Sequence, residues 1–349
     1  MRTLLGIISI GVEVTMMLTL VGLSHGVTDD ISMRDRGTGA DIVVRPPNSN
    51  ALSLGGVDMS EKVVPLIRAQ QHVAMATGTL IQGTTVFNSI AGIHLDEFSA
   101  MSGGFRYVKG GPFQGPHELI VDESQARRDR LRVGSIVKLG KNWKVAGIVE
   151  SGVLSHMITD IVPLQDEYSK TGKINVAWVK VDDPTNIPAV VAGLKDKLDN
   201  YHVDTMAEMQ SLLTPDNVPV VTGFTKVVIG IAAIVGFLVV FLSMYTAVLE
   251  RTREIGILKA LGASPAYVLG ILIRETVLLA VGGVIVGIAM SYGSQVLINN
   301  FAPAFLEMEI VKGWWPIAAA IALVGSLIGA LYPGFKAARQ DAIEALSYD

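Results

Sequence analysis

The chain has 349 residues, of which 50% are hydrophobic before its 36 glycines are counted, and only 17% are charged. Soluble domains hold about 45–50% apolar residues with glycine included and about 25% charged residues, so this composition indicates a membrane protein. The formal net charge of −4 and the 14 prolines argue against a polycationic nucleic-acid binder, an acidic tail and a disordered chain.

The first apolar segment, 4–23, is long enough to cross a bilayer, although Glu13 lies in its middle. Arg2 provides a minimal basic start, so the alternative is a cleaved signal peptide. The apolar stretch is longer than such peptides carry, and no clear small-x-small cleavage site follows it. We therefore expect a retained transmembrane helix within residues 1–24.

Residues 25–220 form a polar insertion after this segment. They hold 19 Lys and Arg and 23 Asp and Glu, which leaves nine of each sign for the rest of the chain. The charged fraction is thus about a fifth inside the insertion and about an eighth outside it, which predicts a soluble domain. With no cysteine in the chain, this domain must be held by its core without disulfides.

The insertion alternates β-rich runs with short helical patterns, which predicts an α+β domain, in two small lobes. The predicted strands are Asp41–Arg45, Thr85–His94, Glu118–Asp122, Ile136–Leu139, Trp143–Val149 and Ala177–Val181. The predicted helices are Ser60–Gln71, with Ser60 as the N-cap and Glu61 in the first turn, Glu123–Leu131 and Ile187–Leu198.

The phosphate-loop motif for nucleotide binding and the zinc-protease motif are both absent. The sequence contains no G-x-x-x-x-G-K-[ST] and no H-E-x-x-H. The six histidines (25, 72, 94, 117, 156 and 202) lack the spacing of metal ligands. His156 beside Met157, and His72 near Met75, are candidate soft-metal or haem ligands, but we favour ordinary surface or loop residues. We expect no metal site, no cofactor in this chain and no enzymatic activity of its own.

Three further apolar runs, 227–249, 276–298 and 314–335, each exceed 20 residues without an ionisable side chain, which predicts three more transmembrane helices. The short connection after the second run is basic, as are the start and the tail, so these parts are predicted to be cytoplasmic. Both termini are then inside and 25–220 is outside. Gly282, Gly283, Gly287 and the alanines of 318–322 offer small faces for close helix packing.

The segment ERTREIGILKALGASP (250–265) predicts a short amphipathic helix between the second and third spans. Ile255, Leu258 and either Leu261 or Gly262 lie at helical spacing as one apolar stripe, with Arg251, Arg253, Glu254 and Lys259 on the opposite flank. Gly262 is a helix stop, and Ser264 followed by Pro265 begins the next helix. Physical reasoning leaves two roles open, an interfacial anchor or a docking element for a cytoplasmic partner.

This segment resembles the signature loop of the FtsX/MacB family of ABC transporter permeases, and the tail 333–349 resembles the family's C-terminal signature. The insertion, with 39–46, 118–152 and 161–168, resembles the family's MacB-like periplasmic core domain. The resemblance implies that the loop is a coupling helix that seats in an ATPase subunit. The implied coupling residues are Glu250, Arg251, Arg253, Glu254, Ile255, Gly256, Leu258, Lys259, Gly262 and Ser264.

The resemblance implies an α-helical membrane protein with four transmembrane helices and the α+β domain inserted between the first two. Its parts would be helix 1 (1–24), the extracytoplasmic core domain (25–220) and an FtsX-like permease domain (221–349). Relatives carry a basic amphipathic helix ahead of the first span where only Met1–Thr3 stand here, so the start is truncated or the lineage lacks that helix. In the tail, Ala342 replaces a common proline.

The expected function is that of an inner-membrane permease subunit that works as a dimer with a separate cytoplasmic ATPase, which binds ATP and Mg²⁺. Movement of the exported domain would drive export or extraction of a substrate from the outer leaflet or the periplasm. A periplasmic adaptor and membrane lipid are further expected partners. The alternative is a non-transporting signalling scaffold that activates an extracytoplasmic cell-wall hydrolase.

Two carboxylates, Glu13 and Glu275, lie within or at the edge of the predicted spans. Glu13 is an ionisable group inside a span, where a charge costs about 2.5–3.5 kcal/mol or more, so a lipid-facing position is disfavoured. It is either a polar contact at the dimer interface or a ligand-sensing group, or it faces the bundle interior without a special role. Glu275, beside Arg274 at the start of the third span, is a milder case.

Overall fold

The computed structural model describes residues 2–49, 56–84, 89–212, 219–302 and 306–339. The chain divides into two compact units. The first, here the helical unit, comprises 1–25, 219–298 and 308–349; the second, here the sheet domain, comprises 26–218 and 299–307.

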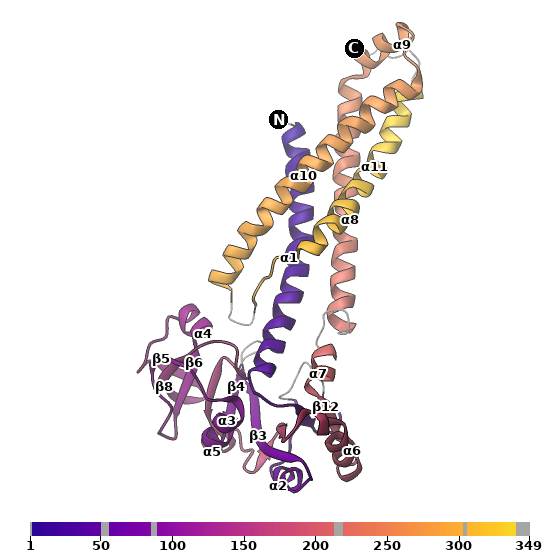
Figure 1. Ribbon diagram of the computed structural model, residues 1–349. Coiled ribbons are helices and arrows are strands. Elements are labelled where there is room, and N and C mark those ends of the chain that lie inside the picture. The colour runs from indigo at the N-terminus through magenta and orange to yellow at the C-terminus, as the bar shows by residue number, and fades with distance from the viewer. Residues whose placement is uncertain (1, 50–55, 85–88, 213–218, 303–305, 340–349) are drawn as a thin grey trace. The chain divides into compact units, whose positions relative to one another are not determined.

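Four helices of the described residues are long and apolar enough to cross a membrane, which confirms the predicted fold class (Figure 1). They are α1 (Arg2–Arg36), α8 (Pro219–Glu250), α10 (Pro265–Phe301) and α11 (Trp315–Arg339). Each is longer than its apolar run, because helix formation needs no apolar side chains beyond the bilayer. In α1, Arg34 and Arg36 in the last turn interact favourably with the helix dipole.

Small residues let the helices of the helical unit approach closely, as the sequence predicted. A Cβ atom on Gly283 would lie 2.5 Å from Ile10 Cβ, and one on Gly287 would lie 2.6 Å from Val14 Cβ. Across the same α1–α10 contact, Thr15 Oγ1 donates a hydrogen bond of 3.1 Å to the Gly287 carbonyl. Ala318 and Ala322 of α11 are buried in the core of this unit.

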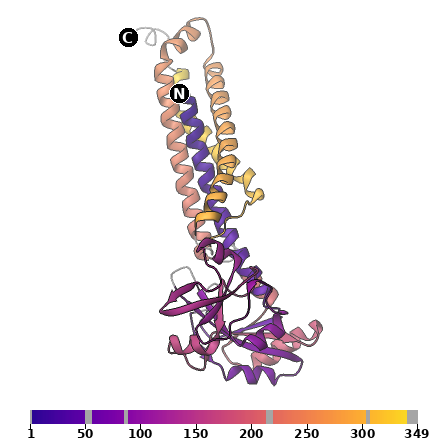
Figure 2. The ribbon, with the colours of Figure 1, turned by 90° about the vertical axis from the view of Figure 1, so that its left-hand side faces the viewer.

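Among the described residues, two short helical elements connect the long helices of the helical unit; the helical turns of the first, α9, lie between α8 and α10 in Figure 2. Helix α9 (Thr252–Ala260) lies between α8 and α10 in the chain, where the coupling segment was expected. A 3₁₀ turn, η3 (Lys312–Trp314), leads into α11.

The sheet domain is built on one mixed sheet. Among the described residues this sheet has ten strands in the order β12-β1-β11-β3-β4-β9-β6-β8-β5, with β7 paired to β8. The strands are β1 (Ile42–Arg45), β3 (Val73–Gly83), β4 (Ser89–Ile93), β5 (Tyr107–Gly110), β6 (Glu118–Asp122), β7 (Ile136–Leu139), β8 (Lys141–Val149), β9 (Met157–Asp160), β11 (Val176–Val181) and β12 (His202–Thr205). The β4–β9 and β6–β8 pairs are parallel, and the other pairs are antiparallel.

Apolar clusters cover both faces of this sheet. In β1, Ile42 and Val44 pack in one cluster and Val43 packs in the other, as the alternation of side chains along a strand requires. The helices that supply the rest of the cover are α2 (Val63–Arg68), α3 (Leu95–Ser102), α4 (Glu123–Arg128), α5 (Ile161–Glu167), α6 (Ile187–Lys197) and α7 (Met206–Leu212), with a 3₁₀ turn, η1 (Pro184–Asn186).

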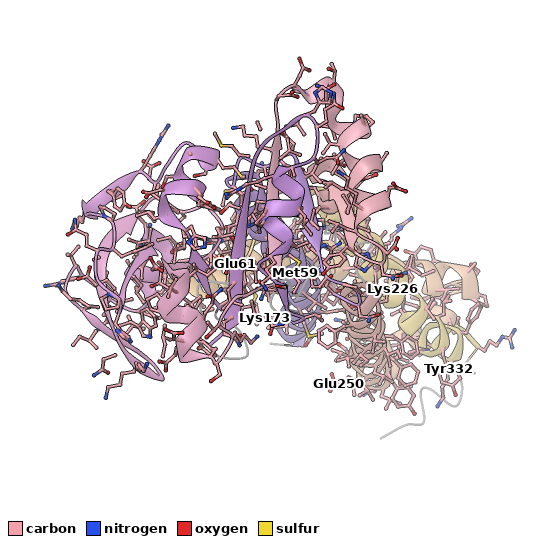
Figure 3. All side chains as sticks on the ribbon, turned by 90° about the horizontal axis from the view of Figure 1, so that it is seen from below. Met59, Glu61, Lys173, Lys226, Glu250 and Tyr332 are labelled. Atoms are coloured by element: carbon pink, nitrogen blue, oxygen red, sulfur yellow. The ribbon has the colours of Figure 1, made fainter. Side chains whose placement is uncertain are left out.

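The structure corrects three sequence predictions for this domain. One continuous sheet replaces the expected two lobes. Ser60 is not a helix N-cap, because Met59–Ser60 forms strand β2, which pairs with β10 (Lys173–Ile174); Met59 and Lys173 of these strands are labelled in Figure 3. Helix α2 begins later, after Lys62. The 11-residue strand β3 was missed, because its small residues lack a clear alternation. Residues 85–88 of the predicted strand 85–94 lie outside the described residues.

The α1–α10 contact yields a test of the helix packing. Gly287→Ala is expected to lower the thermal stability of the purified protein by about 1–3 kcal/mol, because its Cβ would overlap Val14. Gly293→Ala is the matched control on the same helix, since a Cβ there meets no atom within 4 Å. Equal unfolding temperatures for the two variants would contradict this packing.

Candidate functional site

Helix α9 ends in a sharp, well-defined corner. Gly262 has a positive φ of 92°. The Ala263 amide donates to the Leu258 carbonyl and the Gly262 amide donates to the Lys259 carbonyl, which is the Schellman arrangement of a helix C-terminus. Ser264 Oγ accepts a hydrogen bond of 3.2 Å from the Tyr267 amide, and Pro265 begins α10. The predicted helix stop and N-cap are therefore confirmed.

The inner face of α9 is fixed to the ends of the other helices. Thr252, Ile255 and Gly256 are buried, and Ile255 belongs to the apolar core of the helical unit. Lys259 Nζ donates a hydrogen bond of 2.9 Å to the Ala338 carbonyl of α11. Arg251 Nη1 lies 3.1 Å from Glu275 Oε2 of α10. These contacts connect α9 to both α10 and α11.

The outer face of α9 is exposed and amphipathic. It consists of Arg253, Glu254, Ile257, Leu258 and Leu261, and the Leu261 side chain is 81% exposed. The expected single stripe of Ile255, Leu258 and Leu261 was wrong, because Ile255 is buried in the bundle while both leucines are exposed. Lys259 was also misplaced on the charged flank, since its ammonium reaches back to α11.

The remaining predicted positions lie around this helix or within the span. Glu250 is the exposed last residue of α8, and Gly262 and Ser264 are exposed at the corner. Glu275 joins the site through its ion pair with Arg251. Glu13 of α1 is instead buried within the helical unit, 7% exposed, and its carboxylate packs against Gly236 of α8 so closely that a Cβ there would overlap it.

A second group of polar side chains, here the Arg34 cluster, is buried in the sheet domain where α1 ends. Arg34 Nε lies 2.8 Å from Asp30 Oδ2 of the same helix, and Arg34 Nη2 lies 2.8 Å from Asp122 Oδ2 at the end of β6. His156 Nδ1 lies 2.8 Å from the same Asp122 oxygen. All four residues are less than 10% exposed, so the cluster is a buried ionic connection between α1 and the sheet.

Asp122 is the central acceptor of this cluster. Its other oxygen, Oδ1, caps α4 by accepting from the Gln125 amide and also accepts from the Ser124 hydroxyl. Burial disfavours its charge, but the His156 hydrogen bond and the Arg34 charge outweigh that cost, so the pKa of Asp122 lies well below its usual range. Asp122 therefore stays ionised and keeps α1 paired with the sheet.

Sequence reasoning missed this cluster. His156 does lie in a loop, in the bend before β9, but it is not at the surface: it is 7% exposed and its Nδ1 lies 2.8 Å from Asp122 Oδ2. Asp122 and His156 lie 88 and 122 residues after Arg34 in the chain, and at such separations the spacing of residues does not predict a contact. The one local signal was Asp122 itself, an acidic residue directly after a buried strand and before a helix.

Comparisons with known proteins match both parts of the chain. The MacB-like periplasmic core domain matches residues 3–197, more than half of the chain, and the FtsX-like permease C-terminal region matches 226–342. The chain is 35% identical over 153 residues to the uncharacterized ABC transporter permease YknZ of Bacillus subtilis, covering 43% of this chain and 37% of that one.

Over its whole length the chain is also similar to the macrolide export ATP-binding/permease protein MacB of Escherichia coli, 25% identical over 398 residues, covering 99% of this chain and 58% of that one. The periplasmic region of MacB from Actinobacillus actinomycetemcomitans is similar in structure, with a TM-score of 0.39 and 13% identity, covering 51% of this chain and 94% of that one. The chain thus spans less than two thirds of the length of these curated relatives.

Breaking the Arg34 cluster tests its structural importance. Arg34→Met leaves Asp30 and Asp122 buried without their cation, so we expect the free energy of unfolding of the sheet domain to fall by about 3–5 kcal/mol. Hydrogen exchange of the β6 and β9 amides in the full chain measures this. Arg36→Met, two residues later and exposed, is the control, and similar exchange in the two variants would show that the cluster is not a stabilising connection.

The same cluster predicts acid sensitivity. Because the pKa of folded Asp122 is below the unfolded value of about 3.9, its ionised form stabilises the domain above about pH 4, and this contribution is lost as the pH falls toward the folded pKa. Thermal unfolding between pH 5 and pH 3 should show a steeper loss of stability for the natural protein than for Asp122→Asn. The exposed Asp96→Asn serves as control and should keep the steep slope.

Proposed function

The chain belongs to the family of ABC transporter permeases that combine a MacB-like periplasmic core domain with an FtsX-like permease region, and on that premise we propose that it couples ATP hydrolysis by a separate ATPase subunit to movement of its sheet domain. This movement drives export or extraction of a substrate from the outer leaflet or the periplasm. ATP and Mg²⁺ are bound by the ATPase subunit.

The two-sided construction of α9 is the observation that supports this proposal most strongly. A helix that only anchors the chain at the lipid boundary needs an apolar outer face, whereas Arg253 and Glu254 stand beside the exposed Ile257, Leu258 and Leu261. Mixed apolar and charged side chains are typical of a protein interface. The inner face, tied to α10 and α11, lets force on α9 reach the membrane helices.

The path from the membrane helices to the sheet domain is α1. This helix is continuous from Arg2 to Arg36, and its last turns hold the Arg34 cluster. Thr15 of α1 donates a hydrogen bond to the Gly287 carbonyl of α10. The same helix α10 carries Glu275, which forms an ion pair with Arg251, the residue directly before α9. In our proposal, a displacement of α9 moves α10 and α1, and the buried ion pairs transfer it to β6 and β9 of the sheet.

The proposal places the protein in the inner membrane with both termini in the cytoplasm, as the basic short connections favour. It works as a dimer of two permease copies, each with one ATPase on its α9, and takes a periplasmic adaptor as a further partner. The relatives named MacB combine ATP-binding and permease parts in one protein, which supports an ATPase as the partner of this permease.

Substitutions on the outer face of α9 test the coupling. In the double variant Ile257→Glu/Leu261→Glu, two exposed apolar side chains become charged, so we expect the fold to persist while ATPase binding weakens at least about tenfold. The tagged chain is purified from its native membranes. ATP hydrolysis is measured, together with the amount of co-purified protein that carries a G-x-x-x-x-G-K-[ST] motif.

Leu66→Glu is the matched control, because Leu66 is an exposed leucine, 62% accessible, on α2 of the sheet domain. It should retain the ATPase in full. Co-purification of the ATPase with the double variant at the level of the control would contradict the proposal, as would the absence of any such ATPase from the natural protein.

A further inference from the structure

A polar cavity of about 420 Å³ lies beside α4 of the sheet domain, and none of the proposed coupling residues lines it. Its lining comes from α4, from the turn after β8, and from the segment that follows the apolar run of α10. The lining residues are Glu123, Ser124, Arg127, Arg128, Ser151, Asn299, Asn300 and Glu307. The volume lies in the range of small-molecule sites.

Arg128 builds the wall of this cavity. Its side chain is 8% exposed, Nη1 donates a hydrogen bond of 3.1 Å to the Ala302 carbonyl, and Nη2 lies 3.2 Å from Glu307 Oε1. These two bonds hold Ala302 and Glu307 against α4. The wall of the cavity is therefore fixed by side-chain bonds within the domain.

Two residues of the cavity lining directly follow a spanning run in the chain. Asn299 and Asn300 belong to α10 and follow Ile298, the last residue of its long apolar run. Polar side chains that directly follow a spanning run lie in the headgroup region. A ligand in this cavity is thus within reach of lipid headgroups at the membrane surface.

The charges of the lining favour a zwitterion. Two arginines face two glutamates, and the neutral Ser and Asn side chains add hydrogen-bonding groups. Arg128 and Glu307 are already paired, whereas among the described residues no ion pair reaches Arg127, which is exposed, or Glu123. One cation and one anion are thus left for a ligand that carries both signs.

We propose that this cavity binds the phosphoethanolamine headgroup of a membrane lipid. The Arg127 guanidinium pairs with the phosphate, since its planar donors match phosphate oxygens, and the Glu123 carboxylate accepts hydrogen bonds from the primary ammonium. A choline headgroup has no N–H to donate, and a glycerol headgroup has no cation for Glu123. The site therefore distinguishes ethanolamine lipids from both, and it does so independently of ATPase coupling.

The test is lipid binding to the full chain in detergent. Short-chain phosphatidylethanolamine, phosphatidylcholine and phosphatidylglycerol are titrated separately and bound lipid is counted by native mass spectrometry. Soluble glycerophosphoethanolamine is titrated in parallel to separate a lipid from a free headgroup. The variants are Arg127→Gln and Glu123→Gln, and the control is Arg130→Gln, an exposed arginine three residues away that does not line the cavity.

We expect phosphatidylethanolamine to bind most tightly, Arg127→Gln to weaken it about tenfold, as for loss of one charge-assisted hydrogen bond, and Arg130→Gln to leave it unchanged. Glu123→Gln should remove the preference over phosphatidylcholine. Equal binding of the three lipids, a preference for phosphatidylglycerol, equal effects of Arg127→Gln and Arg130→Gln, or equally tight binding of the soluble headgroup would each overturn the proposal.

Discussion

The proposed action of this protein depends on the ion pairs that the buried guanidinium of Arg34 makes with two carboxylates. Arg34 belongs to the helix that begins in the first span, whereas its partner Asp122 ends β6 and its partner His156 lies in the bend before β9. A buried cation is costly unless its charge is compensated, and here two carboxylates compensate it. The cost of separating these charges ties the end of α1 to the sheet, so a movement of α1 must also move β6 and β9.

In the proposed coupling, helix α9 must both hold to its own chain and offer a surface to the ATPase subunit. Burial of Ile255 and the Lys259 bond to α11 fix one face, and this leaves Leu258 and Leu261 exposed on the other. The Schellman turn at Gly262 lets the chain reverse within a few residues into α10. Anchor and docking surface are thus separated on one short helix.

Local physical signals predicted much of this fold. Apolar runs gave the four spans, and β6 and β7 begin and end where their β-branched runs do. Ser60 was misassigned because its pairing partner, Lys173, is far away in sequence. The exposure of the apolar residues of α9 was predicted wrongly. Helical spacing places Ile255 and Leu258 near one another on the helix, but it does not show which of them packs against the other helices. The Arg34 cluster depends on three distant segments, and no local pattern encodes such a meeting.

The most direct test of the central claim is a distance measurement on the assembled complex. The chain has no cysteine, so Ala260→Cys on α9 and Lys62→Cys beside α2 can carry spin labels without a background. With the ATPase bound, electron paramagnetic resonance should show that the distance between these labels changes when ATP and vanadate are added. It should stay constant when a flexible glycine-serine insertion after His25 interrupts α1. Transmission through α1 would be contradicted if the label distance in the uninterrupted protein did not change on addition of ATP and vanadate. It would also be contradicted if the distance still changed in the variant with the insertion.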